Sequence, residues 1–131
     1  HRMTSVLNVD TIADKAGTGP VALTKQHAAK AWVNYDNNGN FETKDTFNTS
    51  SLTDTATGRC TVNFSSNMFD GNYASPASGG NEGASGTIYN LNPNSQSSSN
   101  TELRGRSHAA SSTTGLADLT FNFVAMHGDL A

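Results

Sequence analysis

The alternation of apolar and polar residues in Gly58–Ala74 constrains the fold more than any other part of the sequence. Cys60, Val62 and Phe64 point to one side of an extended chain, and the polar residues between them point to the other. A period of two with β-branched and aromatic residues is typical of a half-buried strand. An Asp-Gly pair then favours a turn, because glycine accepts positive φ without a Cβ clash, and we expect Asn72 to start another strand. The stretch predicts an antiparallel β fold.

The chain has few large apolar residues with which to build a hydrophobic core. Leu, Ile, Val and Phe number 22 of the 131 residues, whereas Ser, Thr, Asn and Gly contribute 58. Disorder of the low-hydrophobicity type also needs a high net charge, and the formal charge here is only −3. The composition therefore predicts one folded domain, rich in turns and short strands. Because a domain of this size buries a modest fraction of its surface, we expect subunits to complete each other's cores in an oligomer.

The charge balance argues against several classes of partner. Eight Lys and Arg against eleven Asp and Glu give no basic surface overall, which disfavours nucleic-acid binding. No apolar run approaches the length of a membrane span, and the residues after Met3 predict no signal peptide. The single cysteine allows no internal disulfide and suits a reducing cytosol. We interpret His1 and Arg2 as a cloning remnant.

The sequence divides into an N-terminal arm, residues 1–29, and a domain, residues 30–131. Val6, Val9 and Ile12 recur at a spacing of three, but their β-branched side chains and the Gly/Pro-rich segment that follows favour an extended arm. Two interpretations of this segment stay open. It is either a loosely ordered terminus, or an arm that packs on a neighbouring subunit or joins a larger assembly.

The domain reads as about six to eight short strands with frequent turns, which predicts a small antiparallel β-sandwich. In the closing strand, Phe121 and Phe123 share one face with Leu119, whereas Asn122 and Val124 share the other. The other expected strands are Ala31–Tyr35, residues 41–53 as one long or two short strands, Thr87–Tyr89 and Thr101–Ala110, and the expected exposed loops are Ser78–Gly86 and Asn90–Asn100.

The densest row of charge lies on one of these predicted strands. Glu102, Arg104, Arg106 and His108 occupy alternate positions, so all four are expected to project from the same face. Three interpretations stay open: a solvated strand face, a subunit interface, or a site for a glycan or an anionic ligand. A guanidinium suits such a ligand because it presents several donors in a rigid fork. Arg104, Arg106 and His108 are therefore the candidate ligand-binding residues.

One stretch matches part of the ligand pattern of a calcium-binding loop. Asp36, Asn38 and Asn40 match its first three ligand positions, but Phe41 stands where glycine is needed and Phe47 where the bidentate Glu belongs. A plain hairpin turn is the better interpretation.

No other motif predicts a cofactor or a reaction. The histidines have no metal-ligand spacing, although His108 or His127 on the three-fold axis of a trimer would suffice for a metal site. The sequence has no Gly-x-Ser-x-Gly elbow, no phosphate-binding glycine loop and no paired histidines with a glutamate on a helix, so we expect no enzyme. Cys60 shares the apolar face of its strand and is expected in the core. Trp32 and Tyr35 have the ring area to stack on a sugar, but single aromatics on strands more commonly belong to a core or an interface.

The stretch Ala29–Ala74, AKAWVNYDNNGNFETKDTFNTSSLTDTATGRCTVNFSSNMFDGNYA, resembles a domain in structural proteins of tailed bacteriophages, notably marine cyanophages. The motif is Ala31–Tyr35 together with Thr61–Phe64. The leader Leu7–Gln26 is similar to segments that precede this domain in tail-fibre-like proteins. The resemblance covers roughly the first 74 residues.

This resemblance implies a small β-sandwich that trimerises in the distal parts of phage tail fibres. The strand pattern also resembles the H-type lectin fold, a six-stranded sandwich that forms trimers and binds sugars. The family usually has an aromatic residue at the position of Cys60 and often proline near Phe69, so this chain departs from it there. No sugar site carries over residue by residue. A virion location follows from the resemblance, with assembly in the host cytoplasm and release by lysis.

Three functions are considered. The first is a virion component, a tail fibre or receptor-binding protein, that attaches as a trimer to host surface glycans. The second is a capsid-decorating or tail-assembly protein that contacts only other virion proteins. The third, a capsule depolymerase, would require paired carboxylates on a long groove, which a chain this short does not build alone.

Overall fold

The computed structural model describes residues 28–83, 86–109 and 115–131. In these residues the chain is entirely β, with no helix and hence none that could cross a membrane. The predicted leader Leu7–Gln26 and most of the predicted arm lie outside the described residues. The strands are β1 (Ala31–Asp36), β2 (Glu42–Phe47), β3 (Thr49–Ala56), β4 (Arg59–Phe64), β5 (Ala77–Gly80), β6 (Thr87–Gln96), β7 (Asn100–Ala109), β8 (Gly115–Leu116) and β9 (Phe121–Met126).

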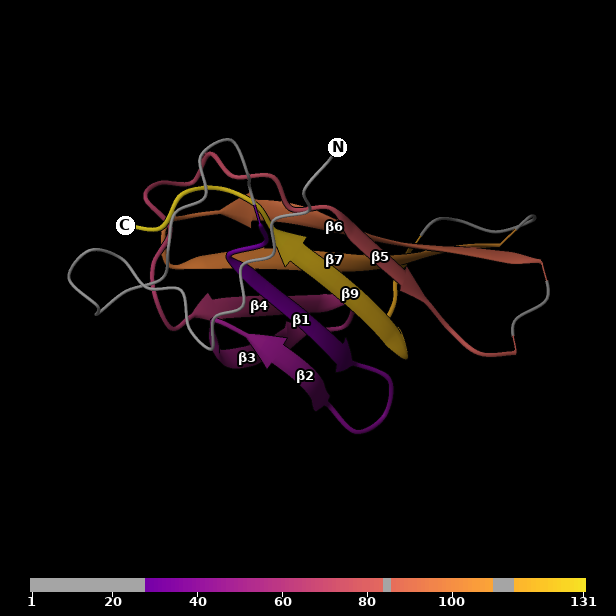
Figure 1. Ribbon diagram of the computed structural model, residues 1–131. Coiled ribbons are helices and arrows are strands. Elements are labelled where there is room, and N and C mark those ends of the chain that lie inside the picture. Colours follow the sequence, from indigo (N-terminus) through magenta and orange to yellow (C-terminus); the bar gives the residue numbers. More distant parts are fainter. Residues whose placement is uncertain (1–27, 84–85, 110–114) are drawn as a thin grey trace, which may run out of the picture.

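The strands form two antiparallel sheets that lie face to face (Figure 1). The first sheet has the order β2-β1-β9-β5, and the second has the order β3-β4-β7-β6 with the short β8 paired to β7. At the right of Figure 1, the Thr87 end of β6 and the adjoining end of β7 project past the neighbouring strands. The prediction of an all-β antiparallel sandwich is confirmed, with nine strands in the described residues in place of six to eight.

The core lies between the sheets and is built by alternation along their central strands. On β4, Cys60, Val62 and Phe64 are buried while the residues between them are partly exposed, as the sequence predicts. The inner face of β1 opposes them from the first sheet. The buried apolar residues are Ala31, Val33, Tyr35, Cys60, Val62, Phe64, Met68, Tyr73, Leu91, Leu103, Leu119, Val124 and Met126.

The thiol of Cys60 lies in this core against the hydroxyl of Tyr35, which comes from the opposite sheet. Burial raises the pKa of Cys60 from 9.0 to about 12, and the hydrogen bond with Tyr35 offsets only part of the effect. Burial raises the pKa of Tyr35 as well. Cys60 is therefore a small protonated core residue, not a nucleophile.

Stability is expected to fall as the pH rises above 9. The unfolded thiol ionises near its ordinary pKa of 9.0, whereas the folded thiol keeps its proton to about 12. The stabilising contribution is thus complete below pH 9 and is lost as the pH rises towards 12, at a slope of up to ~1.4 kcal/mol per pH unit. Urea unfolding at pH 8.0 and at higher pH measures the slope. A Cys60→Ala variant with the same slope as the wild type would contradict this assignment.

Asn48 turns the chain from the first sheet to the second. It is the one residue between β2 and β3, and its φ of 53° lies in the left-handed region, which asparagine tolerates better than most residues. Its Nδ2 donates to the carbonyls of Lys30 and Ser66 at 3.0 Å each, and its Oδ1 accepts from the Ser66 N–H at 2.7 Å. Residues 41–53 thus form two strands in different sheets.

The long exposed loop predicted at Asn90–Asn100 is wrong for most of its length. Strand β6 continues to Gln96 and pairs with β7 along its whole length. It is an edge strand on which Leu91 alone is buried, so backbone hydrogen bonds to β7 hold it without an apolar pattern. Pro93 is tolerated because an edge strand leaves one side unpaired.

The loop predicted at Ser78–Gly86 is wrong at its start. Strand β5 pairs with β9 through Ala77–Gly80. Here glycine permits a close approach: a Cβ at Gly79 would lie 2.7 Å from Cδ1 of Leu119. This glycine therefore belongs to a packed strand, although glycine in a sequence usually indicates a loop.

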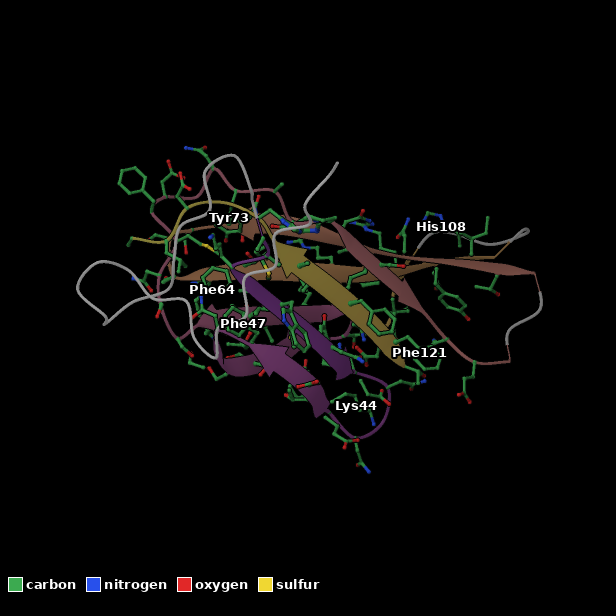
Figure 2. The ribbon with its side chains drawn as sticks, viewed as in Figure 1. Lys44, Phe47, Phe64, Tyr73, His108 and Phe121 are labelled. Atoms are coloured by element: carbon green, nitrogen blue, oxygen red, sulfur yellow. The ribbon has the colours of Figure 1, made fainter. Side chains whose placement is uncertain are left out.

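The strand predicted to start at Asn72 is also wrong. The chain there makes only an isolated bridge, between Ala74 and His127. Tyr73 instead enters the core and meets Phe64 edge-on, with ring centroids 5.8 Å apart (Figure 2). The Tyr73 ring thereby packs the segment after β4 against the end of the sandwich.

Tyr73→Phe is expected to cost about 1–2 kcal/mol of the free energy of unfolding. The hydroxyl lies 2.9 Å from the carbonyl oxygen of Asn100 and 3.0 Å from that of Ser97, and it also contacts the Thr101 hydroxyl. Removing it takes a partner from the Ser97 carbonyl and from the buried Thr101 hydroxyl, whereas the Asn100 carbonyl still accepts from the Ser97 N–H. Chemical denaturation of the variant measures the loss. Tyr89→Phe, at a half-buried tyrosine on β6, is the control, and an equal loss in both variants would contradict the role of this hydroxyl.

The closing strand keeps the predicted alternation but departs at its start. Phe121 and Phe123 face solvent, whereas Asn122 and Val124 face the core. Leu119, grouped with the phenylalanines in the sequence, precedes β9 and is fully buried. The inward Asn122 is satisfied because its Nδ2 donates to the Leu119 carbonyl at 2.7 Å. The larger apolar side chains of β9 therefore lie outside the core.

Candidate functional site

The outer face of the first sheet carries aromatic side chains on two adjacent strands. Trp32 on β1 is the register partner of Ala125 on β9, and Asn34 is the partner of Phe123. All four point outward, because the residues that alternate with them face the core. Residues about ninety positions apart in the chain thus form one surface.

A groove of about 500 Å³ lies on this surface and continues from β1 over β9 to β5. Ser78, the register partner of Phe123 on β5, borders it on the far side, together with Pro76. We call it the aromatic groove. Its lining residues are Trp32, Val33, Asn34, Pro76, Ala77, Ser78, Phe123, Val124 and Ala125.

The aromatic rings of β9 are held parallel. Phe121 and Phe123 stack with centroids 6.5 Å apart and planes 7° from parallel. They remain 39% and 44% exposed, so part of their apolar surface faces solvent. Figure 2 shows Phe121 on the sheet that faces the viewer. Fixed rings offer contact area at a low cost in conformational entropy.

The lining of the groove is mainly apolar and carries no charge. None of its nine lining residues has a titratable side chain. Asn34 contributes an amide with donors and an acceptor, and Ser78 contributes a hydroxyl. These two polar groups flank Trp32 and Phe123, the arrangement of a pocket in which apolar surface supplies affinity and a few polar groups fix orientation.

The candidate residues Arg104, Arg106 and His108 lie on the other sheet. They share the outer face of β7, as predicted, while Leu103 before them and Gly105 between the two arginines are buried. His108 lies near the projecting end of β7 in Figure 2. The structure therefore keeps the predicted row together but places it on a different sheet from the aromatic groove.

The structure adds Arg59 to this row. It is the register partner of Arg104 across β4 and β7, so the two guanidinium groups belong to one surface. Alternation along β4 is enough to place Arg59 outward, but only the register places it beside Arg104. The sequence therefore indicates the face that Arg59 occupies, but not that Arg104 lies beside it.

The calcium-like stretch is a hairpin turn, as predicted. The N–H of Asn38 donates to the Asp36 carboxylate at 2.8 Å, and Gly39 has a φ of 89°. This local bond is the one that favours Asp before a tight turn. Over residues 28–83, 86–109 and 115–131, no three His, Cys, Asp or Glu side chains gather as a metal site.

Sequence reasoning missed most of the aromatic groove. It considered Trp32, which does reach the surface, and Tyr35, which is buried in the core. Phe123, Asn34 and Ser78 were not candidates. A signal was present in β9, because a strand with large apolar residues on both faces has one face that its own core does not use.

No family model, no curated protein and no solved structure matches this chain. The resemblance to tail-fibre domains therefore stays a prediction.

Proposed function

We propose that this chain is a carbohydrate-binding module without enzymatic activity, and that the aromatic groove holds the sugar. The observation that carries the proposal is the set of outward rings, Trp32 and Phe123, flanked by the polar side chains of Asn34 and Ser78. A pyranose ring presents an apolar face of C–H groups and a rim of hydroxyls. The rings of Trp32 and Phe123 can stack on the apolar face of the sugar. The amide of Asn34 and the hydroxyl of Ser78 can form hydrogen bonds with its hydroxyl groups.

The polar groups favour a sugar over a fully apolar ligand. A lipid tail would leave Asn34 and Ser78 unpaired, and burying an unpaired polar group costs about 1–3 kcal/mol. Sugar hydroxyls would pair with both. One groove of this size supports weak binding, so we propose that the chain acts as a homotrimer whose several grooves engage a surface together.

The biological setting is proposed from the sequence resemblance alone. It suggests attachment of a tailed-phage virion, through a tail fibre or receptor-binding component, to glycans on the host surface. The all-β sandwich, which the H-type lectin fold shares in outline, is compatible with this role.

The exposed apolar side chains favour a second candidate function, a decorating or assembly protein with only protein partners in the virion. Phe47 is the register partner of Trp32 on the side away from the groove, and 53% of it is exposed. Phe47, Trp32, Phe121 and Phe123 thus give this outer sheet face an apolar character that a protein partner would cover.

A glycan array probed with the assembled oligomer tests the proposed function. We expect binding to defined neutral or acidic glycans by the wild type and loss of the signal from neutral glycans in Trp32→Ala. Light scattering on the same sample checks the trimer. An array without signal for a correctly assembled oligomer would reject carbohydrate binding and leave the protein-contact function, which antibody labelling of virions would then locate.

A further inference from the structure

The outer face of the second sheet carries three arginines on two neighbouring strands. Arg59 on β4 opposes Arg104 on β7, and Arg106 follows two residues along the same face of β7. Opposed side chains on antiparallel strands have Cβ atoms about 5 Å apart, and the next same-face position is roughly 7 Å along the strand. We call these three residues the arginine surface.

The charge of this surface is only partly neutralised. Glu102 is the one acidic residue on β7, and its Oε1 lies 3.0 Å from the Nε of Arg104. Asn94 donates to the same oxygen at 3.0 Å. One carboxylate thus offsets one of three positive charges, and opposed like charges destabilise a sheet. The arrangement has a cost to the fold that an anionic ligand would remove.

Two polar atoms here have no partner. The Nε of Arg59 and the Oδ1 of Asn90 are shielded from solvent and make no hydrogen bond, and Asn90 is the register partner of Arg106 on β6. In the described part of the chain, the guanidinium groups of Arg59 and Arg106 form no ion pair. The surface therefore has two guanidinium groups without an ion pair and, on Asn90, an acceptor without a donor.

We propose that the arginine surface is a second ligand site, separate from the aromatic groove, that binds the oxyanion of an acidic saccharide. A sulfate ester or a carboxylate would accept from Arg59 and Arg106 as a charge-assisted pair. A neighbouring sugar hydroxyl would donate to Oδ1 of Asn90 once the side chain turns outward. His108, whose Nε2 is 3.5 Å from Nδ2 of Asn90, borders the site.

A saccharide fits better than a nucleic acid because Oδ1 of Asn90 lacks a donor. This acceptor needs a hydroxyl donor beside the anion, and an acidic sugar carries both groups on one ring.

Isothermal titration of the full chain with three tetrasaccharides tests the proposal: a heparin-derived one with sulfate and carboxylate, an oligogalacturonate with carboxylate only, and neutral maltotetraose. We expect the acidic probes to bind and Arg59→Gln and Arg106→Gln each to weaken them at least about fivefold. Binding of the heparin probe alone identifies sulfate, and binding of both acidic probes shows that a carboxylate suffices.

Lys44→Gln on β2 is the matched control, because Lys44 is an exposed cation of the first sheet paired with Glu42.

Several outcomes would overturn the proposal. They are an absence of binding by both acidic probes, unchanged affinity in the two arginine variants at an unchanged melting temperature, an equal loss in Lys44→Gln, or tighter binding of a DNA oligonucleotide than of either saccharide. Trp32→Ala is expected to leave the acidic probes bound. A failure of the aromatic groove and a failure of the arginine surface are thus distinguishable.

Discussion

Gly105→Ala is expected to remove about 3 kcal/mol of the free energy of unfolding. Gly105 is buried in the middle of β7, where a Cβ would stand 2.6 Å from the carbonyl oxygen of Ala117 and 3.1 Å from Cγ of Leu119. That oxygen belongs to backbone held in place, because the N–H of Ala117 donates to the Gly105 carbonyl at 3.0 Å. The N–H of Gly105 in turn donates to Gly58 at 2.8 Å. An added methyl must therefore push these segments apart.

Urea denaturation of the variant measures this loss, and Gly80→Ala is the matched control. Gly80 also lies on a strand, but a Cβ there would meet no atom within 4 Å, so its substitution is expected to change stability by less than about 0.5 kcal/mol. Equal changes in the two variants would show that the close packing of Gly105 does not matter.

The central strands β1, β4 and β7 were predictable because each buries one face against the opposite sheet. A strand of this type must alternate apolar and polar residues, and Ala31–Tyr35 shows the pattern as clearly as Cys60–Phe64. The location of Cys60 in the core followed from the same pattern.

Two of the edge strands, β5 and most of β6, were not predictable from side chains. Leu91 is the one buried residue of β6, and β5 reads as Ala-Ser-Gly-Gly. Backbone hydrogen bonds to β7 and β9 hold these strands in place, and such bonds leave no apolar period in a sequence. Glycine usually signals a loop, but Gly79 here allows a close approach to Leu119.

The candidate sites were predictable one strand at a time but not as surfaces. Alternation placed Arg104 and Arg106 on one face of their strand, and it placed Arg59 on the side of its strand away from Cys60. Pairing Arg59 with Arg104, or Trp32 with Ala125, requires the register between strands distant in the chain. Register depends on the whole set of packed side chains, so a local pattern does not specify it.

Trp32→Ala is expected to weaken binding of a neutral glycan to the aromatic groove by about 30-fold, equivalent to ~2 kcal/mol. Trp32 borders the groove on β1, opposite the Phe123 and Ser78 side, so its loss removes one wall of the site. Phe69→Ala is the control, because Phe69 is 73% exposed but lies outside the groove lining. Isothermal titration of both variants measures the effect, and a loss of equal size in Phe69→Ala would point to general surface hydrophobicity.

Carbohydrate is expected to bind in the aromatic groove, and fluorescence of Trp32 tests this most directly because the chain has a single tryptophan. The measurement is a titration of the wild type with neutral hexose and N-acetylhexosamine oligosaccharides, followed by quenching with acrylamide. We predict a saturable shift of the emission and protection from acrylamide for every neutral glycan that binds on the array. Binding of such a glycan that leaves both the emission and the quenching of Trp32 unchanged would contradict the account.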